Sequence, residues 1–117
     1  MSVILRRIYA EDHPLDGNRI LIDRVWPRGI SKEKARLDDW MKEIAPSSSL
    51  RKWFDHDPDK FEDFKKAYQN EINESKMAQT KLQELKKMAT NERLVLLFGA
   101  RDMKHNHAVV LKEMIEE

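Results

Sequence analysis

The sequence predicts an α/β fold, a compact three-layer domain in which a small, mostly parallel sheet is flanked by helices. The chain has 117 residues, a length that suits one hydrophobic core, so we expect residues 1–117 to form a single domain. Short apolar runs at 3–9, 19–25 and 94–98 are typical of strands covered on both faces. Most of the chain between the second and third runs instead carries apolar residues at helical spacing.

The predicted strands are separated by turn and helix signals. Residues 12–18, which contain Pro14 and Asp16-Gly17, predict a turn between the first two strands. These two strands could pair antiparallel across that turn, which would give an α+β arrangement instead. Parallel pairing of the second and third strands requires a right-handed crossover through helices.

Capping residues and apolar spacing predict the helices. Ser31 is expected to cap a helix that continues to about Lys42, and Ser47 or Ser48 to begin a short one. Asp57-Pro58 is a strong start signal, because Asp accepts from the next amides and Pro needs no donor there. The buried stripes of the two long helices are Phe61, Phe64, Tyr68 and Ile72, then Ala78, Leu82, Leu85 and Ala89. A last helix is expected from about His105 to Glu116.

The composition narrows the classes of function. The 22 Lys and Arg residues are interleaved with 21 Asp and Glu residues, so the net charge of +1 gives no support for nucleic-acid or membrane binding. The absence of cysteine excludes disulfides, thiolate metal sites and thiol nucleophiles. No apolar run reaches the ~20 residues of a membrane span, and the first residues do not form a secretion signal, so we expect a cytoplasmic protein. No feature predicts a cofactor or an oligomeric state.

Polar side chains follow the second and third predicted strands. The residues after the second strand are Asp23, Arg24, Trp26 and Arg28, and those after the third are Arg101, Asp102, His105, Asn106 and His107. Parallel neighbouring strands open at the same edge of a sheet, where open α/β sheets bind ligands. The sequence therefore predicts that the two groups meet in one polar cleft.

The residue types in this cleft suggest an anionic ligand. Arg24, Arg28 and Arg101 could bind a phosphate or carboxylate with paired hydrogen bonds. Asp23 or Asp102 could orient the arginines or act as a general base, with His105 moving protons, which makes these three the catalytic candidates. The other expected ligand contacts are Asn106, His107 and Trp26.

Three other interpretations stay open. Arg–Asp pairs also hold loops together, so the polar residues could form a structural network. The domain could instead be a non-catalytic regulatory or interaction module that binds protein or nucleic acid. His105 and His107 would point about 200° apart on a helix and cannot chelate a metal there, although an extended loop with Asp102 would allow it. We predict no metal site, and we interpret His56 as a turn residue beside the Asp57 cap.

Three segments together resemble the YeaO-like branch of the bacterial domain-of-unknown-function family 488. They are DRVWPRG (23–29), APSSSLRKWFDHDP (45–58) and GARDMKHNHA (99–108), and the likeness covers nearly the whole chain. The resemblance implies a compact α/β fold and a cytoplasmic bacterial protein, but no particular reaction. The family's shared polar positions include Arg51 and His56 besides most of the residues that follow the two strands. Distant branches carry a cysteine that this chain lacks, so thiol chemistry is not transferred.

Overall fold

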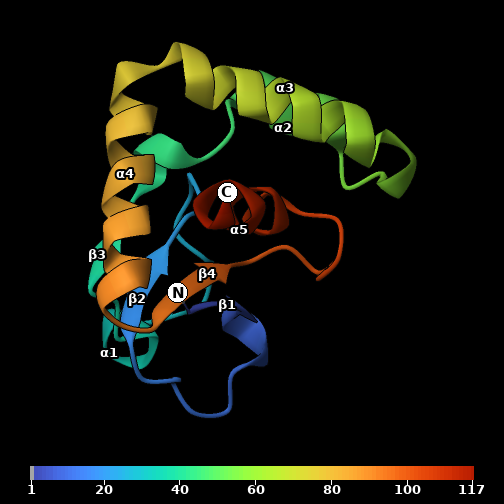
Figure 1. The fold of residues 1–117 in the computed structure, drawn as a ribbon. Coiled ribbons are helices and arrows are strands. Elements are labelled where there is room, and N and C mark those ends of the chain that lie inside the picture. The colour runs from blue at the N-terminus through green and yellow to red at the C-terminus, as the bar shows by residue number, and fades with distance from the viewer. Residues whose placement is uncertain (1) are drawn as a thin grey trace.

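A four-stranded parallel sheet forms the centre of the protein (Figure 1). The computed structural model describes residues 2–117. The strand order is β1 (Val3–Arg7), β4 (Leu94–Phe98), β2 (Asn18–Leu21) and β3 (Asp39–Trp40). The predicted α/β class with a small parallel sheet is confirmed.

Strand β4 is the centre of this sheet. Leu96 of β4 is in register with Leu5 of β1 on one side and with Ile20 of β2 on the other. Strands β1 and β2 both pair with β4 in parallel and not with each other, so the α+β alternative is wrong. The predicted parallel contact between the second apolar run and Leu94–Phe98 is confirmed, and it brings the ends of β1, β2 and β4 to one edge.

Successive residues of the strands point to opposite faces of the sheet. Ile20 and Ile22 pack into the large core, which is completed by α2 (Ser48–Phe54), α3 (Phe61–Glu74), α4 (Lys76–Asn91) and α5 (His107–Glu116). Leu21, Val95 and Leu97 face the other way and are covered by Leu15, Trp26, Leu37 and Trp40. The short elements are α1 (Lys32–Ala35), η1 (Ile8–Ala10), η2 (Lys42–Ile44) and η3 (Pro58–Lys60). The second face is therefore covered mainly by loops and large side chains.

The predicted helix from Ser31 to Lys42 is wrong beyond its first turn. Ser31 does cap α1, but the helix ends at Ala35, and Arg36 adopts a left-handed conformation with φ 49°. The buried guanidinium of Arg19 donates to the carbonyl oxygens of Ala35 and Arg36, which takes the acceptors that a longer helix would use. The chain then turns into β3, which pairs with the edge of β2.

The remaining helices begin close to the expected residues. Ser47 caps α2, and Asp57 caps η3, which leads directly into α3. The last helix begins at His107, two residues later than expected, because Asn106 is the capping residue. No helix within residues 2–117 is long and apolar enough to cross a membrane.

Candidate functional site

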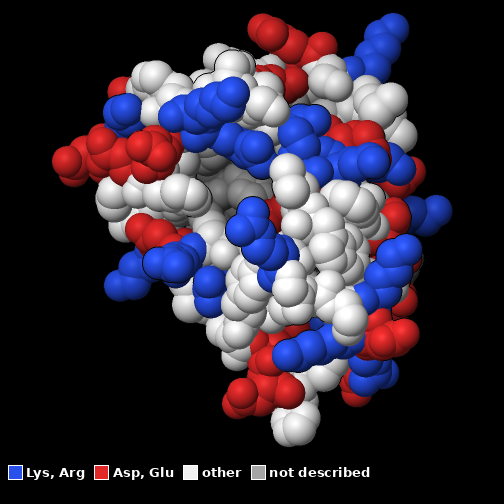
Figure 2. Space-filling model, turned by 180° about the vertical axis from the view of Figure 1, so that it is seen from behind, with Lys and Arg blue, Asp and Glu red and all other residues white. Residues whose placement is uncertain are grey.

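An open pocket of about 1190 Å³ lies where the carboxyl ends of β1, β2 and β4 meet the start of α5 and the end of α2. All nine residues predicted for the cleft line it, namely Asp23, Arg24, Trp26, Arg28, Arg101, Asp102, His105, Asn106 and His107. Figure 2 shows a hollow in the surface with Lys and Arg side chains around it. The two polar groups thus meet in space, while the role of each residue stays a prediction.

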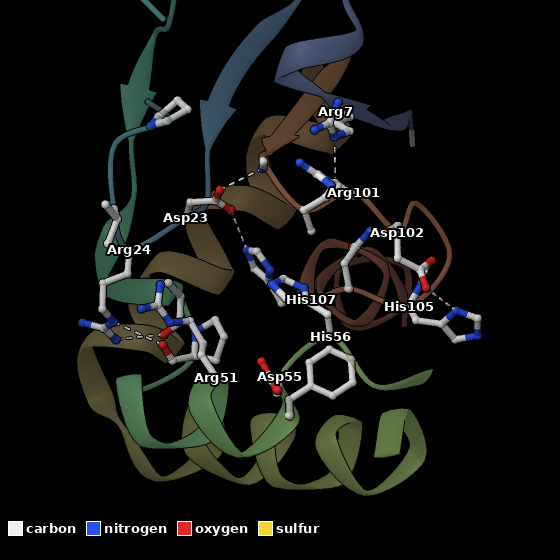
Figure 3. Close-up of a pocket in the computed structure, with 18 of the residues that line it drawn as sticks. Arg7, Asp23, Arg24, Arg51, Asp55, His56, Arg101, Asp102, His105 and His107 are labelled. Atoms are coloured by element: carbon white, nitrogen blue, oxygen red, sulfur yellow. Dashed lines mark hydrogen bonds and ion pairs between the residues drawn. The ribbon is translucent and has the colours of Figure 1, made fainter. Parts of the chain in front are cut away.

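Asp23 joins the ends of β2 and β4. Its Oδ2 accepts a hydrogen bond from the backbone N–H of Gly99 at 2.8 Å. Its Oδ1 lies 3.1 Å from Nε2 of His107, but that N–H is directed to the carbonyl oxygen of Ile22 at 3.0 Å. Oδ1 is therefore shielded from solvent without a hydrogen-bond donor among residues 2–117. Figure 3 shows Asp23 and His107 facing each other across the middle of the site.

The segment between β4 and α5 is organised by Asp102. Its Oδ1 accepts from the backbone N–H groups of Lys104 and His105, and its Oδ2 is 2.9 Å from Nδ1 of His105. The backbone N–H of Lys104 and then that of His105 lower the pKa of Asp102, with a smaller contribution from the His105 ring. The edge of the Phe61 ring packs against the imidazole, so His105 is held in a defined orientation.

The side chain of Asn106 is used within the fold. It is only 2% exposed, its Oδ1 accepts from Val109 N, and its Nδ2 donates to the carbonyl oxygen of Asp102. These bonds cap α5 and fix the preceding loop. Asn106 thus lies at the pocket wall as a structural residue.

The predicted arginines differ in how firmly they are held. Arg24 donates to the carbonyl oxygens of Pro46 and Ala45, at 3.2 and 3.1 Å. Arg28 and Arg101 are exposed, and Tyr9 donates its hydroxyl hydrogen bond to the carbonyl of Arg28. The predicted ligand residue Trp26 donates its indole N–H to Ile30 and packs edge-on against Trp40, which leaves its ring as a wall.

Several polar residues of the pocket were missed as site candidates: Arg7, Tyr9, Arg51, Lys52, Asp55 and His56. Arg7 follows the end of β1, so the same strand-end rule would have found it once β1 was placed beside β4. Arg51 and His56 were indicated only by the family resemblance. His56 is a turn residue as expected, with φ 56°, and it also lines the pocket.

The lining carries a local excess of positive charge. Arg7, Arg24, Arg28, Arg51, Lys52 and Arg101 supply six cations, and Asp23, Asp55 and Asp102 supply three carboxylates. The pocket therefore has a formal charge of +3 with neutral histidines, whereas the whole chain has +1. The sequence predicted three of these cations, Arg24, Arg28 and Arg101, whereas Arg7, Arg51 and Lys52 are added by the fold.

Comparison with known families agrees with the resemblance seen in the three sequence segments. A family model described as the inactive DUF488-N3 subclade matches residues 2–117. The chain belongs to this subclade. Within DUF488, it is 36% identical over 115 residues to the uncharacterised protein YeaO of Escherichia coli K12, which covers 98% of this chain and 97% of YeaO.

A second bacterial relative gives the same result. The chain is 36% identical over 113 residues to the uncharacterised protein Rv3073c of Mycobacterium tuberculosis H37Rv, covering 97% of this chain and 92% of that protein. The predicted YeaO-like membership is confirmed. No solved structure matches the chain.

The arrangement in this DUF488-N3 chain offers hydrogen-bond donors and positive charge rather than metal ligands. Within residues 2–117, no group of three or more His, Asp or Glu side chains is placed to hold a metal ion. His105 and His107 are engaged separately, with Asp102 and with the Ile22 carbonyl.

Proposed function

We propose that this protein binds a small anionic molecule, one that bears a phosphate or carboxylate, in the pocket at the carboxyl edge of its sheet. The observation that carries the proposal is that five arginines line the pocket without a carboxylate partner. Within residues 2–117, the only arginine in an ion pair is Arg19, which bonds Glu11 outside the pocket.

Arginines grouped in this way repel one another, and a bound anion removes that repulsion. Guanidinium groups bind phosphates and carboxylates with charge-assisted, often paired hydrogen bonds. Arg51 adds a specific indication, because its guanidinium lines the pocket and forms no hydrogen bond or ion pair among residues 2–117. A guanidinium without an acceptor in the protein has N–H groups that a bound anion can accept from.

We propose binding rather than turnover, because the subclade is described as inactive. The catalytic candidates then have positioning roles. Asp23 ties together two strand ends, while Asp102 holds His105 and the loop that leads into α5. A pocket built from such fixed groups presents its arginines to a ligand with little loss of conformational entropy.

The test is calorimetric titration at low salt with inorganic phosphate, citrate and a panel of sugar phosphates and nucleotides, on the natural protein and on Arg101→Ala. We expect at least one anion to bind, and Arg101→Ala to weaken its binding by about tenfold, the loss of a charge-assisted hydrogen bond. Arg6→Ala is the matched control, because Arg6 is exposed on β1 and does not line the pocket. Failure of every anion to bind, or equal weakening by Arg6→Ala, would contradict the proposal.

An extended polyanion such as nucleic acid fits this surface less well. On the face shown in Figure 2, Asp and Glu side chains lie among the Lys and Arg side chains away from the hollow. Nucleic-acid binding rests on several phosphate contacts along the backbone and is strongly salt-dependent. Titration with a single-stranded oligonucleotide separates the two cases: tight binding of the oligonucleotide with no binding of small anions would favour an interaction module.

A further inference from the structure

We propose that the ligand carries two separate anionic groups, which two pairs of arginines receive at opposite ends of the pocket. This inference rests on the proposed function and specifies its ligand class. The pairs are Arg24 with Arg51 and Arg7 with Arg101. Figure 3 shows them on different sides of the site, with Asp23 and His107 between them.

The Arg24–Arg51 pair is placed by the segment that leads into α2. Arg24 is anchored on the carbonyl oxygens of Ala45 and Pro46, directly before the Ser47 cap, and Arg51 belongs to α2 itself. Glu71 is bound to the backbone N–H and hydroxyl of Ser47 and does not line the pocket. The guanidinium of Arg51 lines the pocket and forms no hydrogen bond or ion pair within residues 2–117, so this end has unused donors for an anion.

The Arg7–Arg101 pair is placed by the ends of β1 and β4. Arg7 donates from Nε to the carbonyl oxygen of Ala100 at 3.1 Å, which brings its guanidinium beside the residue that precedes Arg101. The guanidinium of Arg7 also lies over the Tyr9 ring, 4.9 Å from its centre, which fixes its plane. Arg101 is exposed and forms no ion pair within the described residues. This end is open to solvent, in contrast to the end at Arg51.

Asp23 makes one central anion unfavourable. Its carboxylate lies between the two pairs in Figure 3 and is held there by Gly99 N and by its contact with His107. A phosphate placed at the centre would meet a like charge, whereas phosphates at the two ends would meet arginines. The middle of the ligand is therefore expected to be uncharged or to carry a hydrogen-bond donor such as a hydroxyl group.

The experiment compares alkylene bisphosphonates of increasing chain length with the alkylphosphonates of matching length, by calorimetric titration at constant ionic strength. Each monophosphonate is used at twice the concentration, so that the number of anionic groups is the same. We expect one chain length to bind at least about tenfold more tightly than its monophosphonate, because the second group then binds at a high effective concentration.

Substitutions in each arginine pair test whether both ends of the pocket bind an anionic group. Arg51→Gln and Arg101→Gln should each reduce bisphosphonate affinity to about that of the monophosphonate, while monophosphonate binding falls by only about twofold, since the other pair remains. If Arg51→Gln does not fold, as judged by its thermal unfolding, Arg24→Gln replaces it for this end, and Arg7→Gln serves as a second variant for the other.

The outcomes separate this inference from the proposed function. Equal affinity for bisphosphonates and monophosphonates, with both lost in the same arginine variant, would indicate a single anion site; the two-ended ligand would then be wrong and the anion pocket would stand. If no phosphonate of either kind binds, both proposals fail. A chain-length optimum that disappears in variants of either end supports the two-ended ligand.

Discussion

The carboxylate of Asp23, just beyond β2, accepts a hydrogen bond from the backbone N–H of Gly99, just beyond β4. Residues 76 positions apart in sequence are joined by this bond at 2.8 Å. The bond closes the edge of the sheet at the point where the pocket begins. The polar residues after each strand are thereby held in a fixed relation to those after the other.

Replacing Asp23 tests this tie directly. Asp23→Ala leaves a partly buried backbone N–H without its charged acceptor and should lower the free energy of unfolding by about 1–3 kcal/mol. Asp23→Asn keeps an oxygen that can accept from Gly99 and should lose less. Urea unfolding measures the change, and hydrogen exchange of the Gly99 amide should accelerate in the Ala variant. Unchanged exchange would show that the bond does not hold the strand ends.

Replacing Arg101 distinguishes a role in ligand binding from a role in holding the loops together. Because its side chain is exposed and forms no hydrogen bond or ion pair within residues 2–117, Arg101→Ala should change the free energy of unfolding by less than about 0.5 kcal/mol. The interpretation of the polar residues as a loop-fixing network predicts a clear loss instead. Thermal and urea unfolding of this variant beside Arg6→Ala decides between them.

Arg19 should be far more important for stability. Its side chain is 5% exposed, it pairs with Glu11 at 2.7 Å, and it also donates to Ala35, Arg36 and Leu15. Arg19→Ala leaves the Glu11 carboxylate buried without its partner and should cost about 3–5 kcal/mol. Urea unfolding measures the loss, and Lys87→Ala, an exposed position on α4 away from Glu11, provides the surface reference. A loss of unfolding free energy no larger than that of the surface variant would show that the Arg19–Glu11 pair does not stabilise the fold.

The pKa of Glu11 predicts how the free energy of unfolding changes with pH. Burial alone would raise its pKa, but hydrogen bonds from Arg19 and Leu15 N together with the charges of Arg19 and Arg6 bring the net pKa below its ordinary value of 4.5. The stabilisation is therefore complete above the unfolded pKa and is lost as the pH falls through the lower folded pKa.

Between about pH 6 and about pH 3, urea unfolding of the natural protein should show a larger loss of stability than that of Glu11→Gln, which cannot titrate at this position. Equal slopes in the two proteins would mean that the Glu11–Arg19 pair does not contribute to acid sensitivity.

Asn106 provides a test of helix capping at the pocket wall. Asn106→Ala removes the cap of α5 and the donor to Asp102 O, and should cost about 1–2 kcal/mol of unfolding free energy. Asn106→Asp keeps the capping oxygen but loses the donor, so its loss should be smaller. If both variants have natural stability but lose anion binding, Asn106 contacts the ligand after all.

The sequence predicted the elements that have strong periodic signals. The stripe from Phe61 to Ile72 and the run Leu94–Phe98 specify their own structure, because their spacing matches one period over several turns or a whole strand. The convergence of Asp23 and Arg101 followed from one general property of parallel sheets.

The missed features depend on contacts that local spacing does not encode. Strand β3 has only two residues, Asp39 and Trp40, which is too short for a pattern and exists because it pairs with β2. Arg19 lies within an apolar run and gave no sign that it would end a helix 16 residues away. Arg51 reaches the pocket because of how α2 packs, which a single sequence leaves open.

The positive charge concentrated in the pocket should also affect how fast the proposed anion binds. With +3 at the pocket in a chain of +1, the rest of the chain has a formal charge of −2, so we expect the proposed anion to be attracted to the pocket more strongly than to the rest of the surface. Such steering raises association rates and weakens as added salt shortens the screening length to about 8 Å at physiological ionic strength. Added salt should therefore lower the association rate constant of the ligand and change its dissociation rate constant much less.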